Sequence, residues 1–161
     1  MNKTALAAVL AAFITAPASA AEKYAGVRLG QAKYNTQGAT ALPVAIGVLG
    51  GYAIDPSFAV EAEYSYLGSI NSSNASAIGV SALAFYPGDK PFSLFAKLSY
   101  TISKWKSSNM VQYNSSFTHG MGGQYDATPS VSFRFSWDRH MIGNQVAINI
   151  DMLSIVGIVK F

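Results

Sequence analysis

The chain has 161 residues, of which 50% are hydrophobic and only 12% charged, and its formal net charge is +3. Ordinary globular domains carry about 25% charged residues, so this chain is too poor in charge for a typical soluble protein. Intrinsic disorder is excluded, because a chain with this much apolar surface does not stay solvated. The length suits one domain. The absence of a basic run longer than two residues argues against a nucleic-acid-binding protein.

The first 20 residues have the pattern of a secretory signal peptide. Lys3 supplies a short positive region, residues 5–14 form an apolar stretch, and Ala18 and Ala20 occupy the small-residue positions of a cleavage site. An uncleaved anchor helix would need nearer 20 apolar residues. We therefore expect residues 1–20 to be removed before Ala21. The mature domain, residues 21–161, is then close to neutral because Lys3 leaves with the leader.

The chain contains no cysteine, which excludes a disulfide framework and a cysteine-based metal site. No motif indicates nucleotide, metal or sugar chemistry, so we expect neither a cofactor nor a metal site. The mature part also has no apolar run long enough for a transmembrane helix. Its high hydrophobic content must therefore be distributed in another way.

Apolar residues alternate with polar or small ones in three clear segments, 58–66, 92–102 and 131–138. A period of two predicts β-strands with two different faces. Weaker patterns predict five further strands, at residues 24–33, 43–54, 76–86, 117–126 and 146–161. In segments 43–54 and 117–126 the pattern does not assign the faces. Several of the strands contain glycine, which relieves crowding on the concave side of a small barrel.

The connections between these segments alternate in length. Residues 54–57, 87–91 and 126–129 are short turns rich in Asp, Pro and Gly, whereas residues 31–42, 68–75, 103–116 and 139–145 are longer polar stretches. Short turns at one end and long loops at the other, around an even number of strands, are typical of bacterial outer-membrane barrels. We therefore predict an all-β fold, an eight-stranded antiparallel up-and-down transmembrane β-barrel.

The charge distribution favours this barrel over a soluble one. A soluble barrel would need abundant charge on its outer face, whereas a transmembrane barrel turns its apolar face to lipid and its polar face inward. We expect Leu83, Phe85 and Phe95 inside, together with three acidic and three basic residues that form ion pairs, because an unpaired buried charge is very costly. The predicted interior charges are Arg28, Glu61, Glu63, Lys97, Arg134 and Asp138. The predicted aromatic girdles at the two lipid interfaces are Tyr64, Tyr66, Tyr86, Phe92, Tyr100, Tyr125 and Trp137.

Two segments carry a resemblance to a known family. Residues 122–129 read GGQYDATP and precede a strand that contains Arg134 and ends in Asp138-Arg139, and the chain ends with an alternating strand closed by Phe161. The sequence resembles the eight-stranded barrels related to the OmpA transmembrane domain. Separately, the terminal Phe161 that closes the alternating last strand resembles the signal read by the bacterial outer-membrane assembly machinery, so we expect that machinery as a partner. Here Asp138 replaces the family's usual Glu, and peptidoglycan tethering by a further domain is not carried over.

The resemblance implies an integral protein of the bacterial outer membrane. Eight strands enclose an interior that side chains can fill, so we expect a structural or interaction role and surface loops that contact partners. A basic rim in these loops is predicted to meet lipopolysaccharide phosphates or an external anionic partner. The predicted rim comprises Lys104, Trp105, Lys106, Arg139 and His140. The alternative is that these are only solvated loop positions.

Two other functions remain open at the level of sequence. One is a small pore of low conductance. The other is a lipid-modifying enzyme of the acyl hydrolase type, for which His119, close to Ser115 and Ser116, is the one candidate base. Because no His-x-Ser motif with a following strand acid accompanies it, we expect that the protein is not an enzyme.

Overall fold

The computed structural model describes residues 22–36, 39–70, 73–87, 91–107, 110–142 and 148–161. The predicted signal peptide therefore lies outside the described residues. All regular structure in the described part is β-strand. The strands are β1 (Glu22–Thr36), β2 (Ala39–Ala41), β3 (Val44–Asp55), β4 (Phe58–Ile70), β5 (Ser73–Pro87), β6 (Phe92–Ser107), β7 (Met110–Thr128), β8 (Val131–Ile142) and β9 (Ile148–Lys160).

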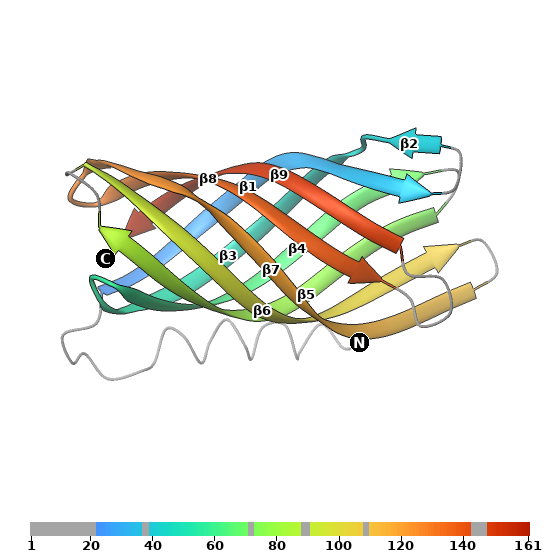
Figure 1. The fold of residues 1–161 in the computed structure, drawn as a ribbon, viewed down its shortest axis with the longest axis horizontal. Helices are drawn as coiled ribbons and strands as arrows, with labels where there is room; N and C mark the ends of the chain where they lie inside the picture. Colours follow the sequence, from blue (N-terminus) through green and yellow to red (C-terminus); the bar gives the residue numbers. More distant parts are fainter. Residues whose placement is uncertain (1–21, 37–38, 71–72, 88–90, 108–109, 143–147) are drawn as a thin grey trace.

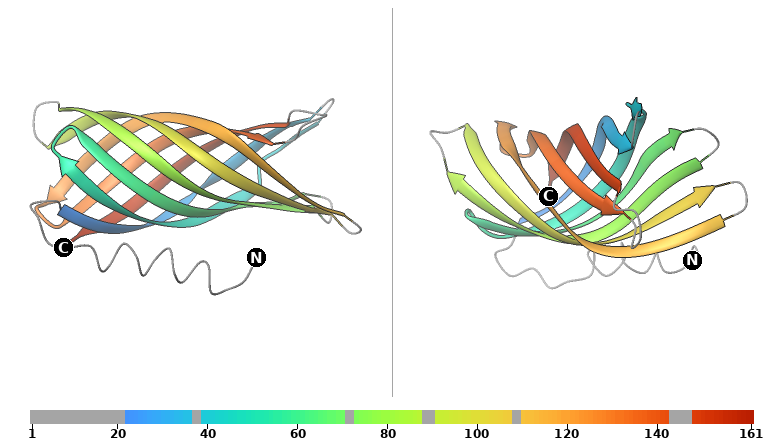
Figure 2. Two further views of the ribbon diagram at one scale, coloured as in Figure 1. Left: turned by 90° about the horizontal axis from the view of Figure 1, so that it is seen from below. Right: turned by 45° about the vertical axis from the view of Figure 1, so that its right-hand side comes forward.

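The strands form one closed antiparallel barrel (Figures 1 and 2). From β3 to β9 each strand pairs with the next, and β1 pairs with both β3 and β9, which closes the sheet. The short β2 pairs with the far end of β1, where Tyr34 lies opposite Ala41. The wall thus has eight strands, as predicted. None of the described residues forms a helix long and apolar enough to cross a membrane.

The alternation seen in the sequence becomes an inner and an outer face of the wall. Along β6, alternate residues from Phe95 to Ser103 are buried inside, while the residues between them are exposed on the outer wall. The two segments whose faces the sequence did not assign follow the same rule. In β3, Leu49 points inward and Val48 outward, and in β7, Gly120 points inward and Phe117 outward.

The strands are longer than the sequence predicts at one end of the barrel. Most of the segment expected as a loop at residues 103–116 instead extends β6 and β7, which stay paired up to Ser107 opposite Met110. In the same way β4 extends to Ile70 and β5 begins at Ser73. Backbone ladder bonds do not depend on apolar alternation, so Ser- and Asn-rich segments can pair where no lipid selects an apolar face. These paired hairpins project from the barrel (Figure 1).

Glycines on the inner face make room for large side chains. A Cβ at Gly120 would collide with Oδ1 of Asp138, and one at Gly122 would lie 2.8 Å from the ring of Phe95. These positions agree with the expected role of glycine on the concave side. Gly68 is different: its φ of 89° lies in the left-handed region, which favours glycine over residues with a side chain.

Candidate functional site

The structure places all six predicted interior charges inside the barrel, and four of them form a closed ring of ion pairs. Arg28 lies 3.2 Å from Glu63 and 3.4 Å from Asp138, and Lys97 lies 3.2 Å from Glu63 and 2.5 Å from Asp138. Each carboxylate therefore contacts two cations. These side chains are at most 6% exposed. Asp138 stands where the family that the sequence resembles usually has Glu. Its shorter carboxylate is paired with Arg28 and Lys97 in this ring.

The other two interior charges form a second cluster nearer the end with the short turns. Arg134 forms an ion pair with Glu61, and Tyr24 donates a hydrogen bond of 2.8 Å to the same Glu61 oxygen. Arg134 also donates two hydrogen bonds, of 3.2 and 2.9 Å, to Oε1 of Gln124. Its guanidinium lies 5.1 Å from the ring centroid of Phe95. Tyr24 and Gln124 were not predicted as members of this cluster. Tyr24 lies inside because it shares the inward face of β1 with Arg28, and Gln124 lies inside because it pairs with Arg134.

Two apolar clusters share the interior with the charges. The cluster near the short turns, which includes the expected Leu83 and Phe95, comprises Tyr24, Leu49, Ala59, Leu83, Phe95, Val156 and Ile158, with Phe85 packed against it. The other, which we call the outer plug, comprises Ala32, Tyr34, Ala45, Leu67, Ala75, Ala77, Ile150 and Met152, with Ile70 and Trp105 packed against it. In the outer plug, Tyr34 donates a 3.0 Å hydrogen bond to the carbonyl of Leu67, and its ring centroid lies 6.0 Å from that of Trp105. Side chains thus occupy the interior at both levels, apart from a cavity at the short-turn end that is described below.

The prediction of a basic rim is wrong for two of its residues. Trp105 packs inside, against the outer plug, rather than on the rim. His140 is 1% exposed and also lies inside the barrel. The reason is the same in both cases: strand β6 continues past Lys97 and β8 continues past Asp138, so the inward positions recur at every second residue.

The predicted girdle residues all lie on the outer wall. Phe92 and Tyr125 pack against each other near the short turns, with ring centroids 4.9 Å apart. Towards the projecting hairpins, Tyr100 packs against Phe117 at 5.6 Å. Phe117 was missed because the sequence did not assign the faces of its segment. Tyr86 is also exposed on this wall, and Tyr64, Tyr66 and Trp137 are half-buried on it.

The three remaining rim residues differ in how they are held. Arg139 donates hydrogen bonds of 2.7 and 3.1 Å to the two carboxylate oxygens of Asp151, so its charge is already matched. Lys104 lies 5.8 Å from the ring centroid of Tyr113. Lys106 is exposed on the same outward face of β6.

The candidate hydrolase set is not assembled. His119 points outward and its ring lies edge-on to Trp137, at 6.0 Å. The nearby strand acid, Asp138, faces the opposite side of the wall and belongs to the interior ring. Over the described ranges, no group of three or more His, Cys, Asp and Glu side chains could hold a metal ion.

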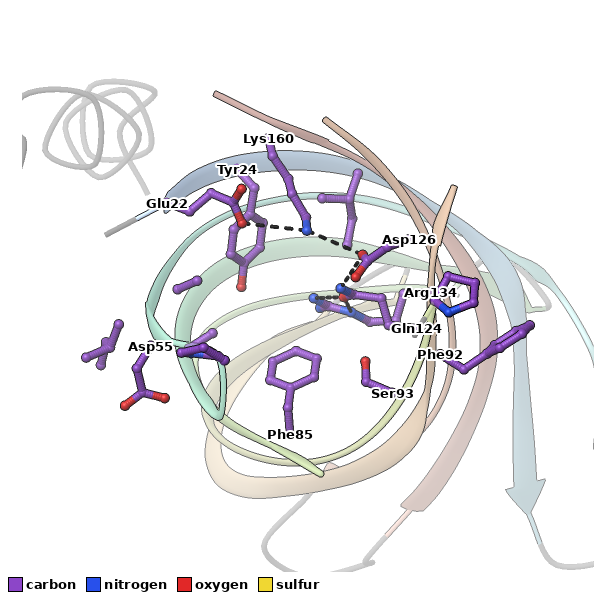
Figure 3. A pocket seen from close by; sticks show the side chains of 16 residues that line it. Glu22, Tyr24, Asp55, Phe85, Phe92, Ser93, Gln124, Asp126, Arg134 and Lys160 are labelled. Carbon is purple, nitrogen blue, oxygen red and sulfur yellow. Dashed lines mark hydrogen bonds and ion pairs between the residues drawn. The ribbon is translucent and has the colours of Figure 1, made fainter. Parts of the chain in front are cut away.

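A cavity of about 400 Å³ opens at the end with the short turns (Figure 3). A polar path follows one wall, from Lys160 to Asp126 at 3.3 Å, from Asp126 to Gln124 at 3.0 Å, and from Gln124 to Arg134. Other parts of the lining are apolar, including Phe85. Because Arg134 is buried and held by Glu61 and Gln124, the cavity ends at this cluster.

Comparison with known proteins identifies one family. Residues 5–156 match the model of the outer membrane protein beta-barrel domain. No curated protein sequence matches the chain. The match covers most of the strands described above, including the projecting hairpins, and names a barrel domain rather than an enzymatic activity.

Several solved structures share the fold. Neisserial surface protein A, NspA, has a TM-score of 0.69 at 20% identity, covering 89% of this chain and 100% of that chain. Ail of Yersinia pestis, in complex with the heparin analogue sucrose octasulfate, has a TM-score of 0.65 at 14% identity, covering 88% and 99%. The N-terminal β-barrel domain of Pseudomonas aeruginosa OprF has a TM-score of 0.54 at 12% identity, covering 84% and 96%. At these identities the similarity shows a shared barrel architecture.

Proposed function

Because this chain belongs to the outer membrane protein β-barrel domain family, we propose that it is a closed barrel whose β6–β7 hairpin binds lipopolysaccharide phosphates at the cell surface. Membership makes it an integral outer-membrane protein. In such barrels the short turns face the periplasm and the longer connections face outward. The hairpins that project beyond the barrel are therefore the part available at the surface, and the cavity at Arg134 faces the periplasm (Figures 1 and 3).

The filled interior supports a structural and interaction role rather than transport. The ion-pair ring leaves each of its two carboxylates bound by two cations. One apolar cluster packs around Arg134 and Glu61, and the other occupies the interior towards the projecting hairpins. A solute would have to break buried ion pairs to pass, which costs several kcal/mol per ion as an order of magnitude. This argues against the alternative of an open pore.

The observation that carries the proposal is the position of two lysines on the hairpin. The register places Lys104 opposite Tyr113 and Lys106 opposite Val111, beyond the girdle pair of Tyr100 and Phe117. Both lysines lie on the face that continues the lipid-facing wall. A cation just beyond an aromatic girdle lies at the depth of lipid headgroups. Lipopolysaccharide carries phosphates at that depth, and lysine ammonium groups bind phosphate as point charges.

The Ail complex gives chemical support. The ligand in that structure is a heparin analogue, sucrose octasulfate, which is an anionic saccharide. Phosphorylated saccharide in lipopolysaccharide belongs to the same broad chemical class. We therefore assign the anion-binding role to Lys104 and Lys106, and a lesser role to Arg139, whose charge is matched by Asp151.

The test is binding of purified lipopolysaccharide to the protein in nanodiscs of zwitterionic phospholipid. Each lysine near a charged membrane surface contributes about 1 kcal/mol, so Lys104→Gln with Lys106→Gln should weaken binding about thirtyfold. The matched control is Lys23→Gln. Lys23 lies 5.6 Å from the ring centroid of Tyr52, a similar arrangement at the periplasmic end, and its replacement should leave binding unchanged.

Equal affinity of the double variant and the wild type would overturn the assignment. Equal losses in the Lys23 control and the double variant would show a general charge effect rather than a hairpin site. Dephosphorylated lipopolysaccharide supplies a second control, because it should bind the wild-type protein as weakly as intact lipopolysaccharide binds the double variant.

A further inference from the structure

His140 occupies an unusual position inside the barrel. Its side chain is 1% exposed, and neither ring nitrogen has a hydrogen-bond partner among the described residues. Among the described residues, the buried hydroxyl groups of Ser65, Ser103 and Thr118 also lack hydrogen-bond partners. A neutral imidazole tolerates such a position better than an imidazolium does, because burying a charge without a partner costs far more than burying a neutral polar group.

The charged groups around His140 are already paired with one another. Four charged groups act on the imidazole. The carboxylates of Asp138 on β8 and Glu63 on β4 attract a positive charge at this position, whereas the cations Lys97 on β6 and Arg28 on β1 repel one. These four groups form the ion-pair ring. A proton on His140 would therefore add one positive charge to a balanced set in which each carboxylate is already occupied by two cations.

The remaining neighbours of His140 lead to the outer plug. On β9 the residue opposite His140 is Ile150, and on β1 the residue opposite Ile150 is Tyr34. Ile150 and Tyr34 both belong to the outer plug, where Tyr34 holds Leu67 by its hydroxyl and lies against the ring of Trp105. The imidazole thus sits one strand away from the apolar residues that separate the ring from the cell surface.

We propose that His140 is a proton-binding site whose protonation opens the outer plug and hydrates the outer half of the barrel. The imidazolium needs two hydrogen-bond acceptors and compensation of its charge: the carboxylates of the ring are already balanced by two cations, and a neutral hydroxyl can accept a hydrogen bond but does not compensate a buried charge. Water from the cell surface can supply them only if Tyr34 and Trp105 move apart. Acid therefore favours the opened state, because that state solvates the charge and the closed state does not. This goes beyond the proposed lipopolysaccharide site and is independent of it.

The test uses Trp105 as a reporter of the plug. The chain has two tryptophans, so Trp137→Phe leaves Trp105 as the single fluorophore. In nanodiscs, lowering the pH from about 7.5 to about 4, across and below the range in which an ordinary histidine gains its proton, should shift Trp105 emission to longer wavelength. It should also increase quenching by acrylamide, and both changes should reverse on return to neutral pH.

Two variants decide whether His140 is the cause. His140→Asn should remove the acid response, whereas His119→Asn, which changes the outward-facing histidine, should keep it. If His140→Asn fails to fold, as judged by loss of heat-modifiable migration on gels, His140→Gln replaces it. An acid response that persists in a folded His140 variant would overturn the proposal, as would wild-type protein whose Trp105 emission is unchanged at acid pH.

The second readout is conductance. Wild-type protein in planar bilayers should open more often when the compartment on the outer face is acidified, and the His140 variant should not. Unchanged conductance in wild-type protein whose Trp105 emission does shift would limit the change to rearranged aromatic packing and would overturn the hydration of the outer half.

Discussion

Inside the barrel, Arg28 and Lys97 each contact two carboxylates, whereas on the β6–β7 hairpin the Lys104 ammonium lies 5.8 Å from the centroid of a tyrosine ring and Lys106 is exposed. The same kinds of cation are therefore used in two ways. In the interior, a charge is stable only when it is paired with opposite charges on other strands. These ion pairs connect the strands of the wall. On the hairpin, in the function that we propose, the lysines bind an external anion instead. Position relative to the lipid decides which role a charge takes.

The largest expected effect comes from breaking the interior ring. Lys97→Met removes a cation from both Glu63 and Asp138 while keeping an unbranched side chain of similar length. Removing one partner of a buried pair typically costs about 3–5 kcal/mol, because it leaves charge uncompensated. We expect a loss of this size in the free energy of unfolding, measured by guanidinium titration in lipid vesicles. Lys104→Met, on the outward face of the same strand, should change it little.

If Lys97→Met and Lys104→Met had equal effects on unfolding, the distinction between interior and hairpin charges would not hold. The comparison within one strand controls for the general effect of removing a lysine from β6.

A smaller effect is expected from crowding the ring. At Gly120, the Cβ of Gly120→Ala would collide with Oδ1 of Asp138 and lie 2.7 Å from the carbonyl oxygen of Trp137. Overpacking of this kind costs about 1–3 kcal/mol. Gly157→Ala is the control, because nothing lies within 4 Å of its added Cβ. Equal midpoints of guanidinium unfolding for the two variants would show that Asp138 moves aside without loss.

The smallest effect is expected at the outer rim. Arg139→Gln removes the bidentate contact with Asp151, but the Arg139 side chain is 40% exposed. Exposed ion pairs contribute little, since water and salt screen them. We expect a shift in the unfolding midpoint smaller than that of Gly120→Ala, and a shift that vanishes in high salt. A loss as large as that of Lys97→Met would mean that the rim holds the barrel closed.

The sequence predicts the fold well because each strand must present one face to lipid and one to a polar interior. That alternation alone is enough to place Glu61, Lys97 and Arg134 inside the barrel. It fails where the lipid ends: residues 103–116 and 139–145 lack the apolar alternation, so the longer strands there were missed. If the inward position of every second residue is continued past Lys97 and Asp138, Trp105 and His140 also fall inside.

Other features depend on three-dimensional packing and have no local signal. The pairing of Asp138 with both Arg28 and Lys97 joins residues from three different strands. The match of Arg139 to Asp151 depends on the register of β8 against β9. A count of equal positive and negative interior charges predicted ion pairs, but it could not say which groups meet.

Side chains close the barrel, and single-channel recording at neutral pH tests this closure most directly. Purified wild-type protein in planar bilayers should give only rare, small openings, because the ion-pair ring and the two apolar clusters fill the path. Lys97→Met, which breaks the ring, should open more often than wild type. Steady, ohmic channels in the folded wild-type protein at neutral pH would show that its side chains do not close the barrel.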